Sequence, residues 1–234
     1  SGPGPLTYTD LYNISYPNSG GVNAFGIRPV RMQTASNNYY FAVHSPYTSK
    51  TNFGIYTLKD PITNPVLTGA AVPVTAYSTP PDPEQLGGGT PRIDGGGANL
   101  RNEPVFKDDV LHLVHSTRVG VYSGVRYLAI STLTNSALTD MVVGDANHYH
   151  TYPAVAVTQD DDVLLTYSKS SENMYMGAYY TIIPSSTGIP SESIELQSGK
   201  GNYVKTFSGT RNRWGDYNGA WTDPSDPDNI YMFT

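Results

Sequence analysis

The sequence contains no cysteine and little charge. Its 234 residues include 14 Lys and Arg against 20 Asp and Glu, which gives a formal net charge of −6. Without cysteine there is no disulfide framework, no thiolate-ligated metal and no cysteine nucleophile. A net negative chain with only 15% charged residues is also a poor match for a phosphate backbone, so we expect no nucleic-acid partner.

Long apolar runs are missing too. None approaches the roughly 18 residues that a membrane-crossing helix needs, so we predict no membrane span. The sequence is instead rich in glycine, proline and tyrosine, of which it contains 23, 18 and 19 residues. This density of helix breakers excludes most helices, and 12% aromatic residues exclude a disordered chain. We therefore predict a single all-β domain with many tight turns.

The short apolar runs recur in a fixed order. The first run of a unit carries a proline near its start, at Pro29, Pro104 and Pro153, and a polar turn and a second β-branched or aromatic run follow. The predicted units cover about residues 25–77, 98–145, 150–198 and 213–234. A four-stranded unit repeated without helices is typical of a β-propeller. We predict one propeller domain over residues 1–234, with a β-sandwich as the alternative.

The last predicted unit stops after its second strand. The sequence thus predicts about three and a half blades of four antiparallel strands, whereas a propeller closes with roughly 4–8 blades. An open ring would leave strand edges exposed. We therefore expect that the chain belongs to a longer polypeptide, or that self-association or an additional chain completes the ring.

One motif carries a family resemblance. Residues 211–219 read Arg-Asn-Arg-Trp-Gly-Asp-Tyr-Asn-Gly, and Asp-Pro-Ser-Asp-Pro follows at 223–227. With residues 93–96, 100–105 and 152–157, this motif resembles bacterial extracellular propellers that carry an RWGDYSG-type motif, the exo-sialidase-like or BNR-type proteins. The resemblance covers about residues 25–234 and implies a secreted or cell-surface protein whose signal peptide has been removed. Gly96, Gly97 and Asn218 depart from the pattern, and many members have no established activity.

Three arginines occupy similar places in different units. Arg28, Arg101 and Arg213 each stand at the start of a first strand, and in a propeller these starts lie at one end of the central channel. Planar guanidinium groups that converge there can bind a carboxylate bidentately. We predict a ligand site from these arginines together with Trp214 and Tyr152.

The sialidase-like resemblance also implies catalytic roles. Sialidases use a tyrosine nucleophile that a glutamate activates, and an aspartate as acid and base. The counterparts implied here are Tyr217 or Tyr152 as nucleophile, Glu103 and Asp216. The alternative for Arg213 and Asp216 is an internal ion pair that fixes the entry to a blade, with Trp214 packed between sheets.

Two segments are candidate metal sites, although no metal is firmly predicted. His148 and His150 would point both imidazoles to one face of a strand. Asp160 and Asp162 stand in an oxygen-rich loop that could hold Ca²⁺. Turns and loops favour these residues anyway, and no other cofactor is predicted.

These features leave three functional hypotheses. The first is a secreted or cell-surface module that binds carbohydrate, a glycoconjugate or another extracellular ligand, because tyrosine and tryptophan rings suit sugar faces. The second is a sialidase-like glycoside hydrolase whose arginines recognise a carboxylate. The third is a structural subunit of an extracellular assembly.

Overall fold

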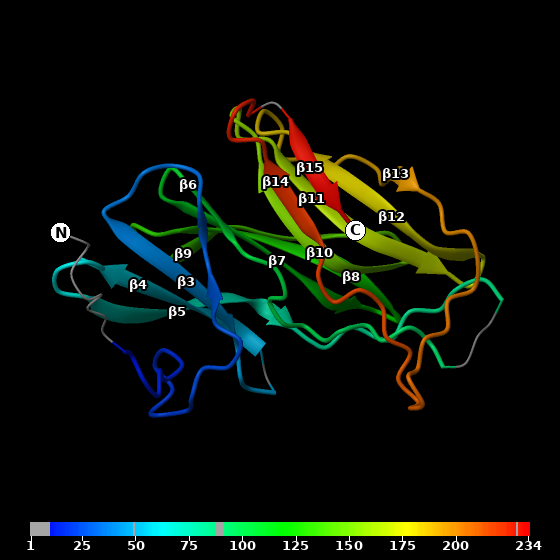
Figure 1. Cartoon of the computed structure of the whole chain (residues 1–234), viewed down its shortest axis with the longest axis horizontal. Coiled ribbons are helices and arrows are strands. Elements are labelled where there is room, and N and C mark those ends of the chain that lie inside the picture. Colours follow the sequence, from blue (N-terminus) through cyan, green and yellow to red (C-terminus); the bar gives the residue numbers. More distant parts are fainter. Residues whose placement is uncertain (1–9, 49, 88–90, 228) are drawn as a thin grey trace, which may run out of the picture.

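The computed structural model describes residues 10–48, 50–87, 91–227 and 229–234. Every regular element in these ranges is a β-strand, so the all-β prediction is confirmed. The described residues contain no helix that is long and apolar enough to cross a membrane. The strands form separate sheets that succeed one another along the chain, from blue through green and yellow to red (Figure 1).

The first sheet is antiparallel with the order β1-β3-β4-β5. Its strands are β1 (Arg28–Pro29), β3 (Asn38–His44), β4 (Lys50–Lys59) and β5 (Val66–Tyr77). Its outer face is covered by the preceding segment of the chain, where Tyr16 packs against Val43 and Tyr56.

The second sheet has the order β2-β6-β7-β8-β9. Its strands are β2 (Arg31–Met32), β6 (Val105–Lys107), β7 (Val110–Val119), β8 (Tyr122–Ser131) and β9 (Ser136–Val143). Asp108 and Asp109 join β6 to β7 with φ angles of 46° and 63°, the left-handed pair that a tight hairpin needs. Strand β2 pairs with β6 in parallel, so residues 28–32 hydrogen-bond to two sheets in turn.

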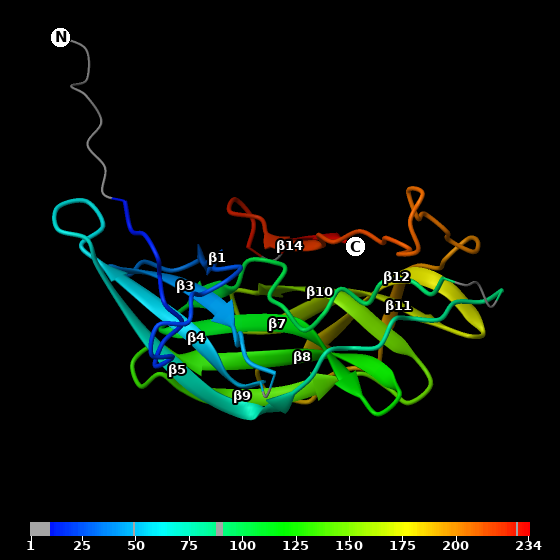
Figure 2. The same cartoon turned by 90° about the horizontal axis from the view of Figure 1, so that it is seen from below.

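The third sheet is antiparallel and the fourth has two strands. The third contains β10 (Tyr149–Val157), β11 (Val163–Ser171), β12 (Met174–Ile183) and β13 (Ile194–Gln197). The fourth contains β14 (Gly219–Thr222) and β15 (Ile230–Phe233). Figure 2 shows β14 lying above β10, and small side chains allow the close approach, because Ala154 and Ala156 pack against Ala220.

The core lies in layers between successive sheets. Between the first and second sheets, Tyr40 stacks on Phe106 with ring centroids 5.0 Å apart. Between the second and third, Val125 belongs to one buried cluster with Leu165 and Tyr167. Face-to-face packing of consecutive sheets buries both faces of the middle ones, which explains why β10 is buried along its whole length. Strand β2 contacts β6, and β10 contacts both β6 and β14. We call these four the inner strands.

Candidate functional site

Two pockets lie along the inner strands, one beyond each side of Arg31. The smaller, here called the arginine pocket, has a volume of about 240 Å³. Its lining includes Arg28, Arg31, Arg101, Glu103, Tyr217 and Trp221. The larger, here called the Gln33 pocket, has a volume of about 530 Å³ and shares only Arg31 and Trp221 with the first.

Arg28 is the arginine best placed to meet a ligand. It comes from β1 and lines the arginine pocket. Its Nε donates to the backbone carbonyl of Leu100 over 3.0 Å, which fixes the plane of the guanidinium. Within the described residues its two terminal nitrogens form no hydrogen bond, so they are available for a bidentate contact with a carboxylate.

Arg101 lines the same pocket but is held by protein groups. Its Nη1 donates to Oδ1 of Asp216 over 3.2 Å, and its Nε donates to the carbonyl of Gly96 over 3.0 Å. The guanidinium also lies 5.5 Å from the centroid of the Tyr152 ring. Gly96 has a φ of 75°, and a Cβ there would lie 2.7 Å from the Tyr152 ring. A glycine is therefore needed where Arg101 and Tyr152 meet.

Asp216 joins the arginine pocket to the motif at 211–219. Its Oδ2 pairs with Nη2 of Arg213 while its Oδ1 accepts from Arg101. The internal ion pair weighed for Arg213 and Asp216 is present, and Arg213 is not among the residues that line the arginine pocket. With both oxygens in contact with guanidinium groups, Asp216 is suited to positioning the arginines.

Arg31 was not predicted from the sequence, yet it bridges three inner strands. From β2 its Nη1 donates to the carbonyl of Ala220 over 2.8 Å, and its Nη2 donates to that of Val155 over 3.3 Å. Burial lowers the pKa of Arg31 to about 10, and the nearby carboxylate of Glu103 opposes the shift; the group is thus a cation at neutral pH. A sequence signal for Arg31 was available, because side chains alternate between the two sides of a strand. With Val30 buried on one side, residue 31 points to the other.

Tyr152 and Trp214 lie outside the arginine pocket. Tyr152 is buried at a bulge in β10 with a φ of 53°, and its hydroxyl donates to the carbonyl of Asp94. Burial raises the pKa of Tyr152 to about 12, which disfavours the phenolate. Trp214 donates from Nε1 to Oγ of Ser168 over 3.0 Å, so it is placed over β11. The pair between Asp94 and Arg211 in this region was not predicted.

Glu103 and Tyr217 line the arginine pocket beside Arg28. The side chain of Tyr217 is 74% exposed, and Glu103 is exposed as well. Among the described residues no hydrogen bond joins their side chains. The structure therefore brings together four of the predicted residues, Arg28, Arg101, Glu103 and Tyr217, with Asp216 behind them.

Three of the four candidate metal residues, His148, His150 and Asp162, contact protein groups. His148 contacts Asp145 through Nδ1, and Nε2 of His150 lies 3.6 Å from Oδ2 of the same aspartate. That oxygen also accepts from Nζ of Lys169 over 2.9 Å, so the ammonium group of Lys169 already neutralises the Asp145 carboxylate. Asp162 accepts from the backbone amide of Ser185 over 2.8 Å. The described part of the chain holds no group of three or more His, Asp or Glu arranged for a metal ion.

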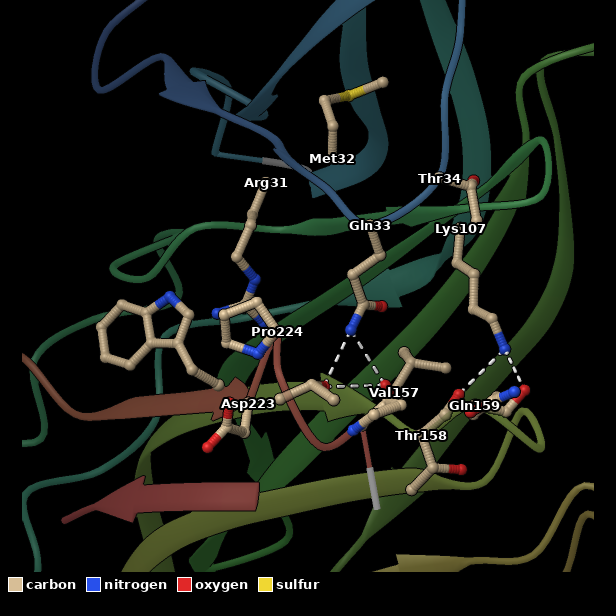
Figure 3. Close-up of a pocket in the computed structure, with 13 residues that line it drawn as sticks. Arg31, Met32, Gln33, Thr34, Lys107, Val157, Thr158, Gln159, Asp223 and Pro224 are labelled. Atoms are coloured by element: carbon tan, nitrogen blue, oxygen red, sulfur yellow. Dashed lines mark hydrogen bonds between the residues drawn. The ribbon is translucent and has the colours of Figure 1, made fainter. Parts of the chain in front are cut away.

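The Gln33 pocket opens at the other end of the same inner strands (Figure 3). Gln33 donates from Nε2 to the carbonyl of Val157 over 3.0 Å and to Oγ1 of Thr222 over 2.8 Å. Figure 3 also shows Lys107 pointing to Thr158 and Gln159, whose carbonyls accept from its Nζ over 2.8 and 2.7 Å. Arg31, Gln33 and Lys107 thus tie the second sheet to the third and fourth sheets.

Comparison with known proteins gives a structural match alone. No family model and no curated protein matches the chain. Among solved structures, the α-L-arabinanase of Penicillium chrysogenum, determined with arabinobiose, superimposes with a TM-score of 0.51 at 13% identity over 94% of this chain. That arabinanase folds as a β-propeller. The chain is a β-propeller. It spans 61% of the length of the arabinanase chain, and the predicted propeller fold is confirmed in place of the β-sandwich alternative.

Proposed function

We propose that this propeller is an extracellular carbohydrate-binding module whose arginine pocket holds a carboxylate-bearing sugar. The observation that carries the proposal is the guanidinium of Arg28, which lines the pocket with its terminal nitrogens free of hydrogen bonds to the described residues. Such a planar fork recognises a carboxylate bidentately. The sialidase-like resemblance of the motif at 211–219 and the arabinanase-like fold both support a carbohydrate ligand.

The charge of the pocket is opposite to that of the chain. The chain carries a net charge of −6, whereas the pocket lining has three arginines and a single carboxylate, Glu103. Asp216 compensates Arg101 from behind and keeps it oriented. A local positive field on a negative protein attracts small anions to the pocket and repels cations from it. It therefore favours an acidic sugar over a neutral one.

Two exposed aromatic side chains flank the arginines. Tyr217 is 74% exposed and Trp221 is 42% exposed, and both line the arginine pocket. Exposed rings of this kind offer a flat apolar surface with a polar tip. A sugar can lie on such a ring while its carboxylate reaches Arg28.

Affinity for acidic oligosaccharides tests the proposal. Isothermal titration with oligogalacturonate and with a sialoside should show saturable binding to at least one of them, and Arg28→Ala should weaken it at least tenfold, because a charge-assisted bidentate bond is lost. Arg118→Ala is the matched control, since Arg118 is exposed on β7 away from the pocket. Equal affinity of the two variants, or no binding of any acidic sugar, would refute the site.

A sialidase-like hydrolase is the second candidate. It is favoured by one observation, namely that Tyr217 and Glu103 line the same pocket as Arg28. Turnover of a fluorogenic sialoside that Tyr217→Phe and Glu103→Gln both abolish, with folding intact by circular dichroism, would establish it. Saturable binding without turnover would leave the binding module. Asp216, in contact with two arginines, takes a positioning role in either case.

A further inference from the structure

We propose that the Gln33 pocket is a second binding site, at the opposite end of the inner strands, and that it takes a neutral oligosaccharide. Its volume of about 530 Å³ falls within the range of small-molecule sites, which is roughly 300–1,000 Å³. This site is separate from the proposed carboxylate site, because the two pockets share only Arg31 and Trp221.

The cations of the Gln33 pocket are engaged by the protein. Nζ of Lys107 donates to the carbonyls of Thr158 and Gln159 and also pairs with Asp161, so all three of its donors are used. Each terminal nitrogen of Arg31 donates to a backbone carbonyl. Lys107 therefore has no free donor for an anion, and Arg31 is more engaged than Arg28, whose terminal nitrogens form no hydrogen bond with the described residues.

The single carboxylate in the lining is satisfied as well. Oδ1 of Asp223 accepts from the backbone amide of Ser225 over 2.8 Å, and Oδ2 accepts from the hydroxyl of Tyr231 over 3.1 Å. Because Lys107 and Asp223 are bound to protein partners, a charged ligand would lose its hydration and gain few new ion pairs. The lining therefore favours an uncharged ligand.

One polar atom in the lining still needs a partner. Oε1 of Gln33 is buried and accepts no hydrogen bond from the described residues, although Nε2 of the same side chain is fully used. A buried acceptor without a partner is unfavourable. The next residue, Thr34, accepts at Oγ1 from the amide of Asp108 over 2.8 Å and keeps its own proton to donate. A sugar diol, with a donor and an acceptor on adjacent carbons, matches this pair once a rotation of the Gln33 side chain brings Oε1 to the pocket surface.

Part of the wall is apolar. Trp221, which is 42% exposed, lines the pocket beside Pro224, Pro227 and Met32. The guanidinium of Arg31 lies 5.4 Å from the centre of the Trp221 ring, which fixes the ring in place. A rigid aromatic face next to an unused acceptor suits the apolar face and hydroxyl edge of a neutral sugar.

Tryptophan fluorescence provides a direct assay. The chain has two tryptophans, and Trp214 lies outside both pockets. In a Trp214→Phe background, Trp221 is the single reporter, and we would titrate it with arabinobiose, cellobiose and maltose. We expect a saturable change in Trp221 emission with at least one of these neutral disaccharides.

Two variants assign the change to the pocket. Gln33→Met removes the acceptor at nearly constant side-chain volume and should weaken binding about three- to tenfold. Gln197→Met makes the same chemical change at an exposed position on β13 and should leave binding unchanged. If Gln33→Met fails to fold, Thr34→Val gives the same test, because it removes only the hydroxyl.

Each other outcome overturns the inference. No saturable change with any of the three disaccharides up to their solubility, or equal affinity in Gln33→Met and Gln197→Met, would refute the site. Emission that instead depends on protein concentration, with dimers in sedimentation velocity, would show that a second copy covers the pocket. Arg28→Ala separates the two proposals, since it should weaken binding of acidic sugars at least tenfold and leave the titration of Trp221 with neutral disaccharides unchanged.

Discussion

Four of the five histidines are buried, and this predicts a protein that loses stability in mild acid. Burial lowers the pKa of His44, His112 and His150 to about 4, and that of His115 to about 3. His148 is the exception, with a partly exposed ring beside Asp145. The four buried rings are neutral in the native state at neutral pH, whereas in the unfolded chain each titrates near its ordinary pKa of about 6.5.

The sign and the size of the effect follow from proton linkage. Between about pH 6.5 and pH 4 the unfolded chain binds protons that the native state does not, so the free energy of unfolding falls as the pH falls through this window. One proton contributes about 1.4 kcal/mol per pH unit. From pH 7 to pH 5 each buried histidine therefore costs about 2 kcal/mol. Four such sites together cost about 8 kcal/mol, which is comparable to the whole stability of a typical domain, about 5–15 kcal/mol.

His115 allows a test at one site. Its Nδ1 donates to the carbonyl of Ser116 over 2.8 Å, and its ring lies against Phe53 and Tyr77, with centroids 5.2 and 4.7 Å away. The guanidinium of Arg126 lies 5.2 Å from the centre of the Tyr77 ring, which also contacts His115. A protonated His115 would therefore have a second cation nearby. His115→Phe keeps an aromatic ring and removes the titrating group.

Urea unfolding at several pH values between 4.5 and 7 measures the effect. The free energy of unfolding should fall steeply with pH in the wild type, and in His115→Phe the slope should be smaller by about one proton, or 1.4 kcal/mol per pH unit. Phe53→Leu is the control and should keep the wild-type slope, because it alters the packing beside His115 without removing a titrating group. A wild-type slope in His115→Phe, or a His115 pKa near 6.5 by NMR, would contradict the reasoning.

Three further substitutions follow from the packing. Asp140→Asn should destabilise by about 3–5 kcal/mol in thermal or urea unfolding, because it leaves the guanidinium of Arg126, 2% exposed, without its charged partner. Gly96→Ala should push the Tyr152 ring away from residue 96, and both the melting temperature and the affinity for acidic sugars should fall. An unchanged melting temperature would contradict this prediction. Ala156→Leu should cost about 1–3 kcal/mol by overpacking the layer between β10 and β14, measured by the same unfolding curves.

The fold was predictable because it rests on local pattern. Short β-branched and aromatic runs, separated by Asp, Asn, Gly and Pro, specify strands and turns without reference to the rest of the chain. The hairpin at Asp108 and Asp109 is an example, since both residues take the positive φ that such turns require. The repeat of these units then predicted sheets without helices.

The candidate site was predictable in part. Arg28 begins β1, whereas Arg101 lies in the loop before β6 and not at a strand start as predicted, yet the structure places both in one pocket. Arg213 follows the same rule in sequence, but its guanidinium pairs with Asp216 and it does not line the pocket. Position along a strand sets where a backbone lies, whereas the partner that a long side chain chooses depends on what the neighbouring sheets bring near it.

By itself, then, the sequence determined the all-β class, the short strands and the tight turns, because periodicity and turn chemistry are local. Only the tertiary structure decided which side chains link the inner strands to one another. Arg31 and Gln33 reach strands that are more than a hundred residues away in the chain, and Arg31 lines both pockets. No spacing in the sequence encodes these contacts, since they arise from the stacking of sheets that are distant in the chain.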